Sequence, residues 1–176
     1  MNTVERSTDT AVSVEEFKAV FRNYPGGVAV ITADSGQGPV ALTATSVASV
    51  SVAPPMLVFS ISELSSSTPT IRKAETVVIH LIRADELSVA QLGATSGVDR
   101  FADHSIWERL PSGEPYFTAI QTWIRARVVR TMDVGGSAVV AVVALETRMS
   151  DEHGDPLVYH NRTWHRLGAH SKIPEV

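Results

Sequence analysis

The feature that most restricts the fold is a series of short apolar runs, rich in Val and Ile and separated by turn residues. These runs lie at 28–32, 56–62, 76–82, 119–130 and 137–147. β-Branched residues suit a pleated sheet, and runs of this length bounded by Gly, Pro and Asp predict strands joined by tight turns. About seven or eight strands and two or three short helices favour a closed barrel over an open parallel sheet. The predicted fold class is mostly β with short helices.

A first helical signal begins at Ser13. Glu16 follows three residues later, which is the spacing of a capping box. Apolar side chains then recur on one helical face, at Phe17, Val20 and Phe21. The pattern predicts an amphipathic helix ahead of the first strand.

The rest of the chain reads as one domain with a long central loop. Further helices are predicted at 69–75 and 85–92. Residues 93–118 are rich in Gly and Pro, and a loop this long in a compact domain is usually functional or at an interface. The polar residues 1–12 predict a flexible N-terminal arm, which leaves 13–176 as the domain.

Composition excludes several classes of function. The chain contains no cysteine, so disulfides, thiolate zinc sites and a cysteine nucleophile are ruled out. The net charge is -4 and no basic stripe is visible, which argues against nucleic-acid binding. No apolar run approaches the length of a bilayer span, and residues 1–17 have no apolar core of the signal-peptide type. We expect a cytoplasmic protein with neither a nucleic-acid partner nor a membrane partner.

The six histidines show no spacing typical of metal ligands, so no metal site is predicted. His80 alternates within an apolar run, which predicts a hydrogen-bonded core or interface position. Strand geometry places His160 and His165 on opposite faces. His160 remains a candidate because it ends a strand beside Asn161 and Arg162. The remaining histidines are expected at the surface, namely His104, His153 and His170.

Two hydroxyl-rich clusters flank one apolar strand. The first is 43–46, with Ser49 and Ser51 after it, and the second is 65–68, ahead of a helix. Hydroxyls and the free N–H groups at a helix start bind phosphate well. Either cluster alone is ordinary strand or capping chemistry. Together they favour a phosphate-bearing ligand that has a flat polar ring.

Six pieces in order resemble the short-chain flavin reductase family, whose fold is the FMN-binding split barrel. The resemblance covers nearly the whole chain after the arm. Its more specific part is Gly26-Gly27-Val28 followed by the hydroxyl-rich run and Pro54-Pro55. The pieces are FRNYPGGVAVITA (21–33), TATSVASVSVAPPMLVFSIS (43–62), SSSTPTI (65–71), TVVIHLI (76–82), DRF (99–101) and PLVYHNRTWHRL (156–167).

The resemblance implies a site residue by residue. The positions that would cradle the isoalloxazine ring are Thr43, Ala44, Thr45 and Ser46, with Ser49 and Ser51 close by. The positions that would face the ribityl chain and phosphate are Ser65, Ser66, Ser67 and Thr68. A basic-aromatic pair near the flavin or nicotinamide corresponds to Arg100 and Phe101. The late pair at the pocket mouth corresponds to Tyr159 and His160, of which His160 is expected to position the nicotinamide.

Five residues at three sites depart from the family's usual pattern. Thr45 stands where Asn is usual. Gly136-Ser137 stands where an Asp-His pair is common, and that histidine helps place the nicotinamide. Val142-Val143 replaces a Gly-Glu pair.

The function implied is an NAD(P)H:flavin oxidoreductase that transfers hydride from NADH or NADPH to FMN or FAD. It would supply reduced flavin to a separate monooxygenase and form a homodimer with flavin near the subunit interface. The departures keep an alternative open, a flavin-binding protein with lost or altered nicotinamide use that assists or acts on a pathway metabolite. A barrel with a purely structural role is a third hypothesis.

Overall fold

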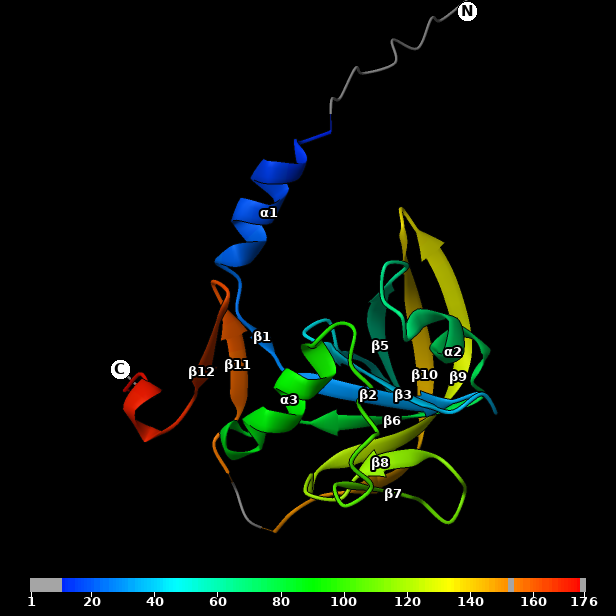
Figure 1. Ribbon diagram of the computed structural model, residues 1–176. Helices are drawn as coiled ribbons and strands as arrows, with labels where there is room; N and C mark the ends of the chain where they lie inside the picture. The colour runs from blue at the N-terminus through cyan, green and yellow to red at the C-terminus, as the bar shows by residue number, and fades with distance from the viewer. Residues whose placement is uncertain (1–10, 152–153, 175–176) are drawn as a thin grey trace, which may run out of the picture.

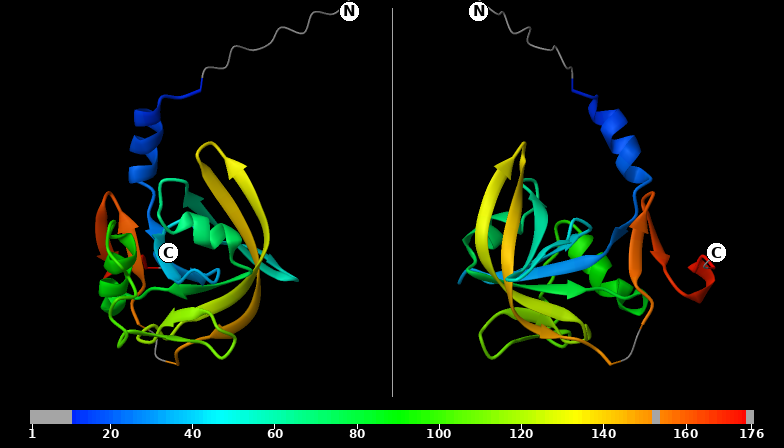
Figure 2. Two further views of the ribbon diagram at one scale, coloured as in Figure 1. Left: turned by 45° about the vertical axis from the view of Figure 1, so that its right-hand side comes forward. Right: turned by 180° about the vertical axis from the view of Figure 1, so that it is seen from behind.

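The computed structural model describes residues 11–151 and 154–174. Its centre is a curved antiparallel sheet of seven strands (Figures 1 and 2). The strands are β2 (Ala29–Asp34), β3 (Pro39–Ala44), β4 (Ala48–Val52), β5 (Pro55–Ser62), β6 (Thr76–Leu81), β9 (Trp123–Val134) and β10 (Ser137–Arg148). Their order is β3-β2-β6-β9-β10-β5-β4. The prediction of a mostly β fold is confirmed.

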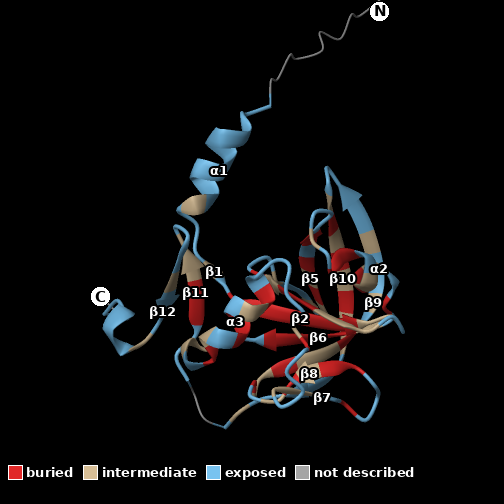
Figure 3. Ribbon diagram, viewed as in Figure 1, coloured by how far each residue is buried: buried red, intermediate tan, exposed pale blue. Residues whose placement is uncertain are grey.

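The core lies inside the curve of this sheet. Ile31 of β2, Phe59 of β5, Ile79 of β6 and Val140 of β10 are almost wholly buried in one cluster. Burial in Figure 3 follows these strands. Strand alternation sends every second side chain inward, and curvature lets β2 and β3 pack against β5 and β10 across the core.

A second layer covers the outside of β2 and β3. It contains α3 (Leu87–Ala94), the 3₁₀ turn η1 (Ala84–Glu86) and the small hairpin β7 (Trp107–Arg109) and β8 (Pro115–Phe117). Helix α2 (Thr68–Lys73) packs against β2. The predicted loop 93–118 therefore includes a hairpin. The predicted helix 85–92 is a 3₁₀ turn followed by α3.

His80 joins the sheet to this layer. Its side chain is fully buried, its Nδ1 lies 2.9 Å from the Val30 carbonyl oxygen, and its Nε2 accepts the Phe117 N–H at 3.1 Å. Burial lowers the pKa of His80 to about 4, and the bond to Val30 opposes that shift. The predicted core position of His80 is confirmed.

A separate three-stranded sheet lies beside the main sheet, with the order β1-β11-β12. Its strands are β1 (Gly26–Gly27), β11 (Leu157–His160) and β12 (Thr163–Arg166), and a 3₁₀ turn, η2 (Ala169–Ser171), follows them. Helix α1 (Val14–Arg22) extends from this sheet and buries none of its residues (Figure 1). The predicted capping box is present, since Ser13 Oγ accepts the Glu16 N–H at 3.3 Å and the Glu16 carboxylate accepts the Ser13 N–H at 3.0 Å.

One local prediction is wrong. His160 and His165 lie on the same face, with ring centroids 5.5 Å apart. The prediction treated them as one strand, whereas the chain reverses at Asn161-Arg162 and pairs His165 with Val158. Diagonal neighbours on antiparallel strands share a face.

Three sequence predictions can be followed only in part. The arm at 1–12 lies outside the described residues except for residues 11 and 12, and so does His153. The described residues contain no helix that is long and apolar enough to cross a membrane. They also contain no cluster of three or more His, Asp or Glu side chains suited to a metal ion.

Candidate functional site

Two cavities meet at the corner where the chain passes from β3 to β4. The inner pocket has a volume of about 570 Å³ and the outer pocket about 730 Å³. Thr45, Ser46 and Ser60 line both. Ser46 Oγ accepts the Ser60 N–H at 2.9 Å, which ties the corner to β5. A ligand could therefore extend from one pocket to the other across this junction.

The inner pocket is rich in hydroxyl groups. Its lining includes Ser62, Ser65, Ser66 and Ser137 together with one cation, Arg100. No Asp or Glu is among the described residues that line it. The full lining is Leu42, Thr43, Ala44, Thr45, Ser46, Ser60, Ile61, Ser62, Leu64, Ser65, Ser66, Gly93, Ala94, Ser96, Gly97, Arg100 and Ser137.

Arg100 is held by the end of α3. Its Nη2 donates to the Thr95 carbonyl at 2.7 Å and its Nε to the Leu92 carbonyl at 3.3 Å. A guanidinium has five N–H donors, so bonds to these carbonyls leave others for a ligand. A fixed cation beside several hydroxyls, with no lining carboxylate, suits a phosphate group.

The second hydroxyl cluster divides between the pocket and the core. Ser67 and Thr68 are each 1% exposed. Ser67 Oγ donates to the Ala41 carbonyl at 2.8 Å, and Thr68 Oγ1 donates to the Ser62 carbonyl at 2.6 Å. These two hydroxyls fasten the start of α2 to the sheet, which leaves Ser65 and Ser66 to line the pocket.

The first hydroxyl cluster, 43–46 with Ser49 and Ser51, also contains hydroxyls that face the pocket and hydroxyls that do not. Thr43 lines the inner pocket, but its hydroxyl donates to the Ala90 carbonyl at 2.6 Å. A Cβ added at Gly93 would lie 2.5 Å from Thr43 Oγ1, so α3 packs against β3 only because residue 93 is glycine. Ser49 and Ser51 lie on β4 and line neither pocket.

Phe101 lies in the core and lines neither pocket. It is 4% exposed, stacks on Phe117 with centroids 5.3 Å apart, and meets Trp107 edge-on at 5.1 Å. Phe101 therefore supports the layer from which neighbouring Arg100 projects. Of this basic-aromatic pair, Arg100 lines the inner pocket and Phe101 packs in the core.

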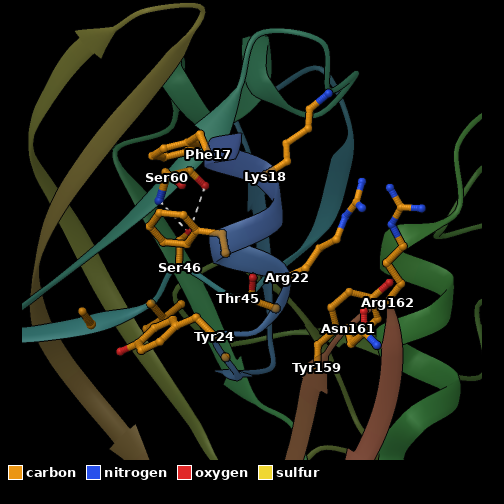
Figure 4. A pocket seen from close by; sticks show the side chains of 14 residues that line it. Phe17, Lys18, Arg22, Tyr24, Thr45, Ser46, Ser60, Tyr159, Asn161 and Arg162 are labelled. Carbon is orange, nitrogen blue, oxygen red and sulfur yellow. Dashed lines mark hydrogen bonds between the residues drawn. The ribbon is translucent and has the colours of Figure 1, made fainter. Parts of the chain in front are cut away.

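The outer pocket lies between α1, the corner and the β11–β12 turn (Figure 4). Aromatic rings from Phe17, Phe21, Tyr24 and Tyr159 line it. Phe17 and Phe21 are each 55% exposed, so the apolar face of α1 borders the cavity rather than the core. The other lining residues are Lys18, Arg22, Gly26, Thr45, Ser46, Val47, Ala48, Ser60, Asn161 and Arg162.

His160 is not among the residues that line either pocket. Strand alternation turns its neighbour Tyr159 toward the outer pocket and turns His160 toward His165. Sequence reasoning did not assign Phe17, Phe21 or Tyr24 to a site. The sequence nevertheless contains one signal for them. The helix predicted after Ser13 is amphipathic, and the sequence pattern predicts no partner element for its apolar face.

The departures from the family pattern fall in three environments. Gly136, with φ of 82°, belongs to the tight β9–β10 turn. Ser137 opens β10, pairs with Ser62 and lines the inner pocket. Val142 is fully buried in the core, whereas Val143 faces outward beside Met56. Among the departing residues, Thr45 lines both pockets and Ser137 lines the inner one, whereas Gly136, Val142 and Val143 line neither.

Comparison with known proteins agrees with this geometry. Residues 21–168 match a family described as "Flavin reductase like domain". The NADH:FMN oxidoreductase of Rhodococcus qingshengii is 40% identical over 162 residues, which cover 89% of this chain and 83% of that protein. The reductase component of a 4-nitrophenol 4-monooxygenase/4-nitrocatechol 2-monooxygenase from Rhodococcus opacus is 28% identical over 145 residues, covering 82% and 76%.

A solved structure gives the same result for the fold. The flavin reductase domain protein from a species of Arthrobacter has a TM-score of 0.83 and 31% identity, covering 88% of this chain and 95% of that one. The family match takes in all seven strands of the main sheet and the whole inner pocket. The chain therefore belongs to the family of flavin reductase-like domains, as its resemblance to the short-chain flavin reductases predicted.

Proposed function

We propose that this flavin reductase transfers hydride from NADH or NADPH to FMN or FAD and releases the reduced flavin to a separate monooxygenase. The observation that carries the proposal is the shared wall of the two pockets at Thr45, Ser46 and Ser60. Two ligands bound on either side of one junction can bring their rings together there. The Rhodococcus relatives, an NADH:FMN oxidoreductase and a monooxygenase reductase component, support the same chemistry.

The flavin is assigned to the inner pocket and the junction. Ser65, Ser66 and Arg100 fit the phosphate because they supply hydroxyl donors and a cation with no lining carboxylate beside them. Thr45 and Ser46 would border the isoalloxazine ring. Bound flavin and nicotinamide supply the redox chemistry, which is passage of a hydride from nicotinamide C4 to flavin N5. The protein contributes alignment of the two rings.

The nicotinamide is assigned to the outer pocket. Its aromatic side chains offer flat surfaces, and one of them, Tyr159, pairs across the strands with Gly26, which lies against Thr45 of the junction. Tyr159 packs against Trp164 with centroids 4.6 Å apart, so its ring is held in place. We assign to Tyr159 the positioning role that the resemblance implied for His160.

Activity with the four flavin–nicotinamide pairs, followed at 340 nm, tests the proposal. NADH or NADPH should be consumed only when flavin is present. Bound flavin without consumption of either donor would instead support the alternative of altered nicotinamide use.

Ser46→Trp tests the position of the flavin. The indole would fill the junction, so we expect flavin binding to be lost while the circular dichroism spectrum is retained. Ser49→Trp is the matched control, because Ser49 lies outside both pockets. Normal flavin affinity in Ser46→Trp would show that the ring binds elsewhere.

The homodimer is assigned to the outer face of β5 and β10. Val58 and Ala141 lie side by side there, and Met56 pairs with Val143. All four side chains are only partly buried, although the opposite face of both strands is the core. This apolar strip of β5 and β10, which Arg127 and Arg130 of β9 border, fits a second copy of itself about a two-fold axis. Ala48, beside Val58, also lines the outer pocket, so a partner subunit would border the site.

Val58→Lys tests this interface by placing a charge at its centre. We expect a monomer by size exclusion with light scattering, and a dimer for the natural protein. Gln37→Lys is the control, because it adds the same charge at the exposed β2–β3 turn. A dimeric Val58→Lys protein, or a monomeric natural protein, would contradict the assignment. The cytoplasmic location stays a prediction.

A further inference from the structure

The outer pocket gathers cations that the hydride transfer itself does not require. Lys18 and Arg22 stand one helical turn apart on α1, and Arg162 comes from the β11–β12 turn. Figure 4 shows the three side chains extending from the wall of the same cavity. No Asp or Glu is among the described residues that line it. Lys18 pairs with Glu15 at 3.0 Å, but neither arginine has an ion pair among the described residues.

The backbone at Arg162 indicates that its side chain has a role. Asn161 and Arg162 form the two-residue turn between β11 and β12, with φ of 47° and 62°. Asn suits the first position of such a turn, and Gly suits the second. Arg162 thus occupies a left-handed position that glycine would adopt without steric cost. The local backbone gives no reason for an arginine at this position.

A single hydrogen bond brings the two arginines together. The Asn161 N–H donates to the Arg22 carbonyl at 2.9 Å, across 139 residues of sequence. This bond joins the last turn of α1 to the hairpin turn. The helix dipole favours a cation at Arg22, but it gives no reason for a second guanidinium beside it. Adjacent like charges without a carboxylate form a preorganised site for an anion.

We infer that Arg22 and Arg162, supported by Lys18, bind the pyrophosphate of the reduced nicotinamide dinucleotide. This inference rests on the proposed position of the nicotinamide in the outer pocket. The pyrophosphate is the first anionic group along the dinucleotide from the nicotinamide ring. Guanidinium groups match its oxygens because their N–H donors lie in one plane and can bind in pairs.

Arg162→Gly separates this binding role from a structural one. Glycine relieves the left-handed backbone, so the thermal midpoint should stay equal or rise, whereas the cation is lost. We expect the KM for NADH and for NADPH to rise about tenfold or more, with kcat within about twofold, because a charge-assisted hydrogen bond is removed. The phosphate-free donor 1-benzyl-1,4-dihydronicotinamide should react with the variant and the natural protein at the same rate.

Arg166→Gln is the matched control, because Arg166 belongs to the same hairpin but lines neither pocket. Its KM values should equal those of the natural protein. An unchanged KM for both dinucleotides in Arg162→Gly would overturn the inference. A loss confined to NADPH would also overturn it, because that result would point to the 2′-phosphate.

Tyr159→Leu distinguishes failure of this inference from failure of the proposed nicotinamide position. A higher KM for all three donors in Tyr159→Leu supports the position itself. If that occurs while Arg162→Gly has no effect, only the pyrophosphate site is wrong. If Tyr159→Leu changes the KM for none of the donors, the nicotinamide position is wrong and the inference falls with it.

Discussion

His80 should make the stability of this protein fall between pH 7 and pH 5. The folded state holds the imidazole neutral, since its side chain is fully buried between Val30 and Phe117 and its pKa is about 4. The unfolded chain takes up a proton near the ordinary value of 6.5. A depressed histidine pKa stabilises the fold above the unfolded pKa, and this stability is lost as pH falls toward the folded pKa.

The magnitude follows from the two pKa values. Linkage gives a loss of about 2 kcal/mol in the free energy of unfolding between pH 7 and pH 5, and of about 3 kcal/mol once pH is below 4. The interval from pH 7 to pH 5 separates the effect of His80 from that of two carboxylates. The pKa values of Asp34 and Glu114 are lowered, so the stability that these groups contribute is lost at lower pH. Urea unfolding at half-unit pH steps measures the effect.

His80→Gln is the decisive variant. The amide keeps hydrogen-bonding capacity without titrating, so its stability should be lower at pH 7 and nearly flat between pH 7 and pH 5. His104→Gln, a change at an exposed position, should keep the natural pH profile. A flat profile in the natural protein, or an unchanged slope in His80→Gln, would show that His80 is not the source of the pH dependence.

Three further predictions concern Gly93 beside the inner pocket, the Glu114–Arg125 ion pair and His160. Gly93→Ala should cost about 1–2 kcal/mol by urea unfolding, because its Cβ would meet Thr43 Oγ1 at 2.5 Å, and adding Thr43→Ala should recover part of that loss. Glu114→Ala should cost about 3 kcal/mol, since it strands Arg125, whose Nε lies 2.7 Å from the Glu114 carboxylate; a loss below about 1 kcal/mol would count against a buried pair. His160→Ala should leave the KM for NADH within about twofold of the natural value, and a large rise would restore the role that the resemblance implied.

The sequence alone predicts most of the fold. Short apolar runs, with or without alternation, are typical of strands that bury one or both faces in a sheet. The local sequence pattern therefore predicts β2, β5, β6 and β10. The capping box at Ser13 likewise starts α1 from adjacent residues. The sequence determines the ends of the strands less well than their existence. The predicted strand 119–130 is observed as Trp123–Val134, because pairing with β10 rather than local pattern sets its ends.

The site is only partly determined by sequence. The two hydroxyl clusters together predict a ligand site, and several of their residues line the inner pocket. Their pattern does not show that Ser67 and Thr68 turn inward while Ser65 and Ser66 face the pocket. That division depends on the carbonyls of Ala41 and Ser62, which only the folded sheet brings within reach.

The outer pocket depends on contacts between segments that are far apart in the sequence. The sequence shows an amphipathic helix with basic residues and a hairpin turn with an arginine, separated by more than a hundred residues. The bond from the Asn161 N–H to the Arg22 carbonyl makes them one surface. Local propensity acts over neighbouring residues, whereas a binding site depends on contacts between distant ones. The sequence therefore determines the strands and the side chains available, and the hydrogen bond between α1 and the β11–β12 turn brings Arg22 and Arg162 to one cavity.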